Sequence, residues 1–330
     1  MPIFTERFSL LYQCLKIIVR IAIKIFCRKI IINKPALLKE KGPLLLACNH
    51  PNSFLDGVIL DTIFQQPLYS LARGDVFKKP FYSRLLTSLN LLPVYRTSEG
   101  VENLTSNYDT FESCKDIFRK NGIVIIFSEG KCINEWHLRP LKKGTARLAI
   151  SSWAENIPLR VLPVGINYSS FRRFGKNMFI NFGEMIEKKD TDTSQPDGIL
   201  YQAFNTQLEQ QLKQLVFEID KKDKGKQQRL LQQKPTVLKK ILLSLPAFIG
   251  FITHLPVYLP VKSFTLKRTN HNDHYDSVMI GILLFAYPVY LLFLSLIIFI
   301  ITGSWLAFSL IVLLPFTAWS YVQLKPQLDK

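Results

Sequence analysis

Residues 44–56 read LLLACNHPNSFLD, and their pattern is the strongest indication of the fold. Apolar and small residues come first, a histidine and a proline follow, and Asp56 stands at the head of the next apolar segment. A short apolar run that ends in turn residues is typical of a buried strand. The stretch therefore predicts a strand, a turn that contains His50, and a helix that begins near Asp56.

The same alternation continues over about residues 40–190. Short apolar runs at 67–72, 91–96, 123–130 and 159–168 alternate with segments of helical periodicity. Strands that alternate with helices predict an α/β domain with a largely parallel sheet flanked by helices. Residues 191–236 are polar, and we expect a helical linker there, with one surface helix over about 198–231.

The C-terminal part of the chain is hydrophobic, from 237 to 330. Residues 277–302 and 305–322 carry no charge. At about 1.5 Å per residue, the first run is longer than the roughly 30 Å hydrocarbon core of a bilayer. The two runs predict a transmembrane helical hairpin. Its basic flanks place both ends on the cytoplasmic side of a cell membrane.

Residues 237–261 are also apolar, but Pro246, Pro256 and Pro260 interrupt them. Proline removes a backbone donor and kinks a helix. We therefore expect an interfacial or re-entrant segment.

The N-terminal residues 1–39 predict a basic amphipathic helix in the membrane interface. Basic residues recur every fourth position beside a broad apolar face, at Lys16, Arg20, Lys24 and Arg28. A secretory signal has an uncharged apolar centre, which this segment lacks. The basic side chains are expected to reach the phosphates of anionic lipids. The alternative is an ordinary amphipathic helix packed on the domain.

Composition narrows the class of protein. The 330 residues include 24 Phe and 12 Tyr, which is too apolar for an intrinsically disordered chain. Five widely spaced cysteines do not form a disulfide framework and indicate reduced thiols. The net charge of +17 suits either nucleic acid or an anionic membrane. The hydrophobic hairpin favours the membrane, so no nucleic-acid partner is expected.

His50 and Asp56 are the candidate catalytic pair. A carboxylate on one ring nitrogen fixes the histidine tautomer and makes the other nitrogen a better general base for a hydroxyl. Because no serine or cysteine is obviously paired with them, the attacking group is expected to be the substrate's own hydroxyl. The alternative is a helix cap in which Asn52 or Ser53 caps and His50 is only a polar loop residue.

Charged residues follow other predicted strands. Arg96 comes after one run, Glu129 and Gly130 after another, and Lys142 and Lys143 precede a helix. Ligands of open α/β sheets bind at the carboxyl ends of the strands, and basic residues there suit a phosphate.

These residues resemble the glycerophospholipid acyltransferase family, which includes 1-acylglycerol-3-phosphate and glycerol-3-phosphate acyltransferases. The resemblance covers about residues 40–185 and rests on four blocks in order: Asn49-His50 with Asp56, Leu92–Arg96, Phe127–Gly130 with Leu141–Gly144, and Val161–Val164. The chain departs from the common pattern in having five residues between His50 and Asp56, where the family usually has four, and Ser128 where it usually has proline.

The resemblance implies an O-acyltransferase. His50, oriented by Asp56, would deprotonate a glycerol hydroxyl, which attacks the thioester of acyl-CoA or an acyl carrier protein. Backbone donors near the loop would stabilise the oxyanion. The remaining site residues would hold a glycerophosphate or lysophospholipid acceptor: Asn49, Arg96, Glu129, Gly130, Lys142 and Lys143. No metal or cofactor is implied. The leading acceptor is 1-acylglycerol-3-phosphate, with glycerol-3-phosphate and aminolipids as alternatives.

Three other functions compete with this one. A thiol nucleophile would pair Cys132 with His137, or Cys48 with His50. A metal site would use the H-x-D-H-x-D spacing of 271–276, although a solvated turn is the preferred interpretation. A non-catalytic lipid-binding scaffold would keep the membrane segments and have no use for the His50–Asp56 pair.

Overall fold

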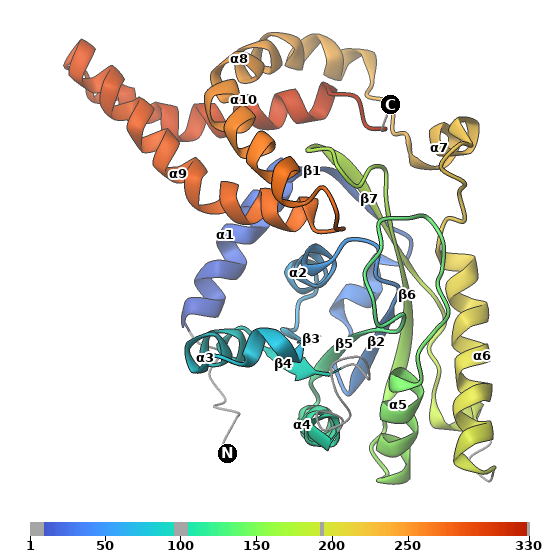
Figure 1. Ribbon diagram of the computed structural model, residues 1–330. Helices are drawn as coiled ribbons and strands as arrows, with labels where there is room; N and C mark the ends of the chain where they lie inside the picture. Colours follow the sequence, from blue (N-terminus) through green and yellow to red (C-terminus); the bar gives the residue numbers. More distant parts are fainter. Residues whose placement is uncertain (1–9, 96–104, 192–194, 329–330) are drawn as a thin grey trace.

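The computed structural model describes residues 10–95, 105–191 and 195–328 (Figure 1). Its centre is a seven-stranded sheet with the order β1-β7-β6-β2-β5-β3-β4. Neighbouring strands are parallel except for β6 and β7. The strands are β1 Cys27–Ile32, β2 Leu44–Cys48, β3 Leu68–Arg73, β4 Leu91–Val94, β5 Ile123–Phe127, β6 Arg160–Tyr168 and β7 Lys176–Phe182.

Helices cover both faces of the sheet, because the side chains of its central strand alternate between two apolar cores. Leu44, Leu46 and Cys48 of β2 pack with α2 (Phe54–Ile63) and the end of α1 (Leu10–Phe26). Leu45 and Ala47 pack on the other side, where the core is completed by α4 (Thr105–Arg119), α5 (Gly144–Ala154) and α6 (Asp197–Leu215). A short helix, α3 (Pro80–Ser88), leads into β4. The predicted α/β fold with a largely parallel sheet is confirmed.

The N-terminal helix ends earlier than its basic periodicity predicts. α1 stops at Phe26, and Cys27 begins the edge strand β1, which runs parallel to β7. The β-branched run Ile30–Ile32 favours a strand at this point. Within the described part of residues 1–39, only Leu10–Phe26 is therefore an amphipathic helix.

Two basic side chains of α1 bond to α2, and one of them, Lys16, is largely buried, whereas Arg20 and Lys24 stay exposed. The Lys16 ammonium lies 3.3 Å from the Asp61 carboxylate of α2, and Arg20 Nε donates to the Thr62 carbonyl. The exposed side carries Leu10, Leu11, Ile17, Ile18 and Ile21. The expectation that Lys16 reaches lipid phosphates is wrong for this reason, while the broad exposed apolar face remains.

Residues 191–236 contain two helices instead of one. α6 buries Leu200, Phe204, Leu208 and Leu212 against the sheet. Its chain then turns into α7 (Lys224–Leu231), which begins at the Asp223 cap. The single surface helix expected over 198–231 is thus interrupted, and its first half is part of the domain core.

Three helices of the C-terminal region are long and apolar enough to cross a membrane: Val237–Arg268, Tyr275–Thr302 and Trp305–Leu324. The first is α8, the second is α9 and the third contains α10 (Leu310–Leu324). α9 and α10 form the predicted hairpin, with a left-handed Gly303 at the turn.

α8 is continuous through its three prolines and arches over α10 (Figure 1). Near its start, Lys239 Nζ donates to Gln323 Oε1. Further along α8, the centroid of the Tyr258 ring lies 5.5 Å from Lys325 Nζ, at the same end of α10. Gly250 lets the arch approach closely, since a Cβ there would meet the Thr317 carbonyl.

Candidate active site

The candidate site lies at the carboxyl ends of two adjacent parallel strands. β2 and β5 end side by side, with Cys48 opposite Phe127. His50 follows the first strand by two residues, and Glu129 follows the second. The structure thus brings together two sequence blocks that lie almost eighty residues apart.

His50 and Asp56 are in direct contact. His50 Nδ1 lies 2.9 Å from Asp56 Oδ2. Asp56 stands in the first turn of α2 and is fully buried. Its Oδ2 also accepts the Asn52 N–H at 2.8 Å, and its Oδ1 accepts the Tyr168 hydroxyl at 2.7 Å. Donors on both oxygens suit an ionised carboxylate, which keeps the proton of the neutral imidazole on Nδ1.

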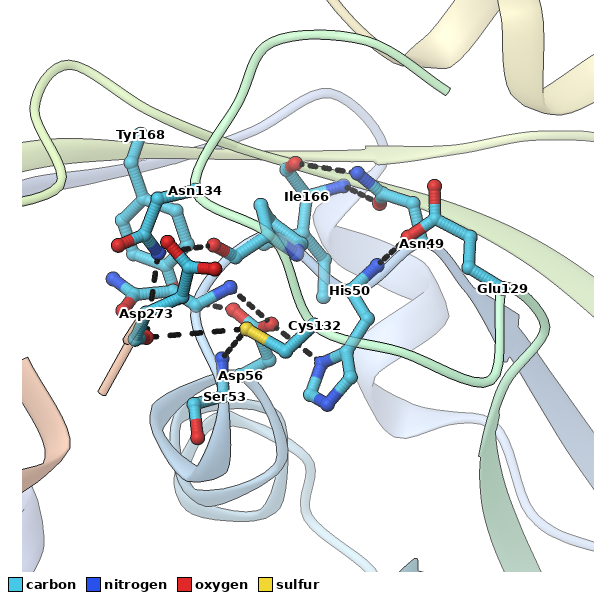
Figure 2. A network of polar contacts seen from close by, with 12 residues as sticks. Asn49, His50, Ser53, Asp56, Glu129, Cys132, Asn134, Ile166, Tyr168 and Asp273 are labelled. Atoms are coloured by element: carbon cyan, nitrogen blue, oxygen red, sulfur yellow. Dashed lines mark hydrogen bonds and ion pairs between the residues drawn. The ribbon is translucent and has the colours of Figure 1, made fainter. Parts of the chain in front are cut away.

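The other ring nitrogen of His50 is available for chemistry. The ring stacks on Phe127 with centroids 3.8 Å apart, and 16% of the side chain is exposed. Figure 2 shows Nε2 pointing away from Asp56. No residue in the described part of the chain hydrogen-bonds to this nitrogen. A base with one fixed and one accessible nitrogen can accept a proton from a bound hydroxyl.

Three backbone N–H groups of the turn are already used inside the protein. Those of His50, Asn52 and Ser53 donate to Glu129 Oε2, Asp56 Oδ2 and Cys132 Sγ. Ser53 holds a φ of 52°, in the left-handed region, which completes this compact turn. The oxyanion donors that the resemblance implies near the loop are therefore not these three groups.

Glu129 ties the turn to the following loop. One carboxylate oxygen accepts the His50 N–H at 2.7 Å and the other accepts the Arg139 N–H at 2.8 Å. Burial raises the pKa of the Glu129 carboxyl, although both backbone donors act in the opposite direction. Gly130 beside it has a φ of +66°, a conformation that favours glycine.

The other predicted site residues occupy different positions. Asn49 is buried and pairs with the backbone of Ile166 through both amide atoms, which fixes the end of β2 against β6. Lys142 and Lys143 are exposed at the start of α5, and Lys142 lies against Gly130. Arg96 lies outside the described residues.

The site also contains residues that the sequence analysis did not assign to it. Tyr168, at the end of β6, and Asn52 both contact Asp56. The turn before α9 is docked on the turn that contains His50: His274 Nδ1 lies 2.6 Å from Ser53 Oγ, and Asp276 accepts from Asn52 Nδ2 at 2.6 Å. The solvated turn expected at 271–276 is wrong for Asp276, which is fully buried, whereas His274 stays exposed. The only sequence signal for this segment is its H-x-D-H-x-D spacing, which predicts either a metal site or a solvated turn.

A thiol nucleophile does not fit this geometry. Cys132 Sγ accepts the Ser53 N–H, and burial raises the pKa of its thiol (Figure 2). Its suggested partner His137 is bound to Glu218. Cys48 is fully buried, and burial raises the pKa of that thiol as well.

A metal centre is not assembled from the 271–276 segment. In the described ranges, no three side chains of His, Cys, Asp or Glu are gathered as ligands. His274 and Asp276 turn instead to Ser53 and Asn52.

Comparison with known proteins yields one family. Residues 29–167 match the family model described as Acyltransferase. No curated protein sequence matches the chain. Among solved structures, the chain is similar to the 1-acyl-sn-glycerophosphate (LPA) acyltransferase PlsC from Thermotoga maritima, at 16% identity and a TM-score of 0.44, over 63% of this chain and 81% of that one.

The matched residues span the sheet from β1 to β6 and include the His50–Asp56 pair, the Glu129 loop and the start of α5. The four sequence blocks lie inside this range and in the order that the resemblance requires. Residues 29–167 of the chain are therefore similar to the Acyltransferase family.

Proposed function

We propose that this protein is a membrane-bound O-acyltransferase that moves a fatty acyl group from acyl-CoA or an acyl carrier protein to a hydroxyl of a glycerophosphate or lysophospholipid. The observation that carries the proposal is His50 itself, with Nδ1 bound to a buried carboxylate and Nε2 accessible. The first acceptor to test is 1-acylglycerol-3-phosphate, which would yield phosphatidate.

In this mechanism, His50 Nε2 takes the proton of the acceptor hydroxyl while its oxygen attacks the thioester carbonyl. Asp56 stabilises the imidazolium that forms. The tetrahedral intermediate then collapses, the carbon–sulfur bond breaks, and His50 returns the proton to the leaving thiolate. Both half-steps use one histidine, so no acyl-enzyme, metal or cofactor is required.

The acceptor phosphate would be held by basic side chains near the loop. Lys142 and Lys143 are exposed at the start of α5, with Lys142 beside Gly130, and their long side chains can extend toward a ligand in front of the strand ends. Arg96 is proposed for the same role from its sequence block alone. Replacing Lys142 and Lys143 together with methionine should raise KM for phosphorylated acceptors about tenfold or more, since each charge-assisted hydrogen bond is worth about 1.5–3 kcal/mol. An unchanged KM would remove these lysines from the acceptor site.

The proposed attachment to a membrane rests on α1 near the N-terminus and on the α9–α10 hairpin near the C-terminus. The exposed apolar side of α1 and the α9–α10 hairpin would anchor the domain to the cytoplasmic side of a cell membrane. The return of α8 to the same end of α10 suits a re-entrant segment. The acceptor then reaches His50 from the lipid layer in which it already lies.

The test is a panel of acceptors assayed with the wild-type protein and with His50→Ala. The panel contains 1-acylglycerol-3-phosphate, glycerol-3-phosphate and an amino-acid-headed lyso-lipid, each with labelled acyl-CoA or acyl carrier protein. We expect His50→Ala to lower transfer by about 10²–10⁴-fold, the contribution of a general base. Near-normal transfer by His50→Ala would refute the assignment, and no transfer to any acceptor by the wild type would favour a lipid-binding scaffold.

A further inference from the structure

A second group of buried charges lies next to the turn that contains His50 and Asn52. Lys176, the first residue of β7, forms an ion pair with Asp276, the second residue of α9. Both side chains are 0% exposed. Buried ion pairs carry a large desolvation cost and are weak devices for stability alone. A role for this pair is therefore better sought in the residues that Lys176 and Asp276 contact.

Asp276 connects the membrane helix to the catalytic aspartate through one residue. Its Oδ2 accepts from the Asn52 side-chain amide at 2.6 Å. The backbone N–H of the same Asn52 donates to Asp56 Oδ2 at 2.8 Å. That oxygen also receives His50 Nδ1. A continuous path of buried hydrogen bonds thus runs from the first turn of α9 to the imidazole.

Lys176 also lies near Tyr168, a second residue that bonds to Asp56. Its ammonium lies 5.8 Å from the centroid of the Tyr168 ring, and the Tyr168 hydroxyl donates to Asp56 Oδ1. The Lys176 ammonium also lies 5.5 Å from the centroid of the Phe26 ring, at the end of α1. The pair is therefore enclosed by elements that hold both oxygens of Asp56.

We propose that Asp276 and Lys176 are positioning residues of the acyltransferase site, so that the first turn of α9 completes the active site by fixing Asn52 and, through it, the Asp56–His50 pair. This inference rests on the proposed role of His50. It gives the membrane hairpin a second task beside anchoring, because the hairpin begins with the residue that holds the catalytic turn.

Two double variants test this path. Lys176→Met with Asp276→Leu removes both charges and the acceptor for Asn52, without leaving an unpaired buried ion. Lys176→Met with Asp276→Asn removes the same charges but keeps an amide oxygen that can accept from Asn52. We expect the first to lower kcat by about 10- to 100-fold, as displaced catalytic groups do, and the second to stay within roughly threefold of wild type.

Asn52→Ala provides a variant that leaves the ion pair intact. It should lower kcat as much as the leucine variant, and adding the leucine variant to it should cause little further loss. His271→Asn, an exposed residue of the same turn, is the matched control and should keep wild-type activity. Equal activities for the leucine and asparagine double variants, or fully additive losses with Asn52→Ala, would overturn the proposal.

A spectroscopic measurement separates this proposal from the proposed function. The full-length protein in micelles has five histidines, so the ring N–H proton of His50 can be assigned by comparison with His50→Ala. We expect its hydrogen-bonded signal to weaken or shift in Asn52→Ala and in the leucine variant, and to remain in the asparagine variant and the control. An unchanged signal in the first two would overturn the positioning role, whatever reaction the wild type catalyses.

Discussion

Asp56→Asn tests the charge of the catalytic pair without removing its shape. The backbone N–H of Asn52 points at Oδ2, so the amide oxygen of the new side chain should take that position and its NH2 group should face Tyr168. The tyrosine hydroxyl can accept from the amide as well as donate. His50 Nδ1–H then keeps an acceptor, and the tautomer required for catalysis is retained.

The expected loss follows from the missing charge. The two charged groups of wild type would sit about 4 Å apart, which at an effective dielectric constant of about 20 gives about 4 kcal/mol of attraction in the imidazolium state. The lower bound on the lost stabilisation is about 1 kcal/mol, which is the difference between a charge-assisted and a neutral hydrogen bond. At about 1.4 kcal/mol per tenfold, kcat should fall roughly 5- to 1,000-fold.

Single-turnover acyl transfer with saturating acceptor measures this loss directly. The control is His50→Ala, which should be slower than Asp56→Asn because it removes the base itself. A loss near 10⁴-fold would mean that the amide leaves the histidine in the wrong tautomer. Either that result or a wild-type rate would refute the reasoning, since the first contradicts the predicted amide orientation and the second the need for the charge.

Two further perturbations probe groups around the pair. Tyr168→Phe removes one donor from a buried carboxylate and should lower the free energy of unfolding by about 1.5–3 kcal/mol, measured by urea denaturation; a change below about 0.5 kcal/mol would show that the bond contributes little. Because burial raises the pKa of the Cys132 thiol, this residue should remain a neutral thiol at pH 8 and resist iodoacetamide, whereas the exposed Cys14 is alkylated. Peptide mass spectrometry compares the two, and loss of activity in step with alkylation of Cys132 would contradict its structural role.

Local patterns were sufficient for most strands of the sheet, although not for β1, and for the His50–Asp56 contact. Alternating apolar runs predict parallel strands, and a separation of a few residues limits how far a histidine and an aspartate can move apart across one turn. Contacts of long sequence separation carry no such local signal. Tyr168 is 112 positions from Asp56, and Asp276 is 224 positions from Asn52. The predicted exposure of Lys16 was wrong for the same reason, since its partner Asp61 lies 45 positions away in the sequence.

The junction between α1 and β1 has a mechanical consequence. The helix ends at Phe26 and the strand starts at Cys27, with no connecting loop between them. The strand is hydrogen-bonded into the sheet, so the helix has no hinge about which to swivel. If the exposed apolar side of α1 rests on a bilayer, as proposed, the tilt of the α/β domain would be set with it. The carboxyl ends of β2 and β5 would then keep one constant angle to the lipid surface.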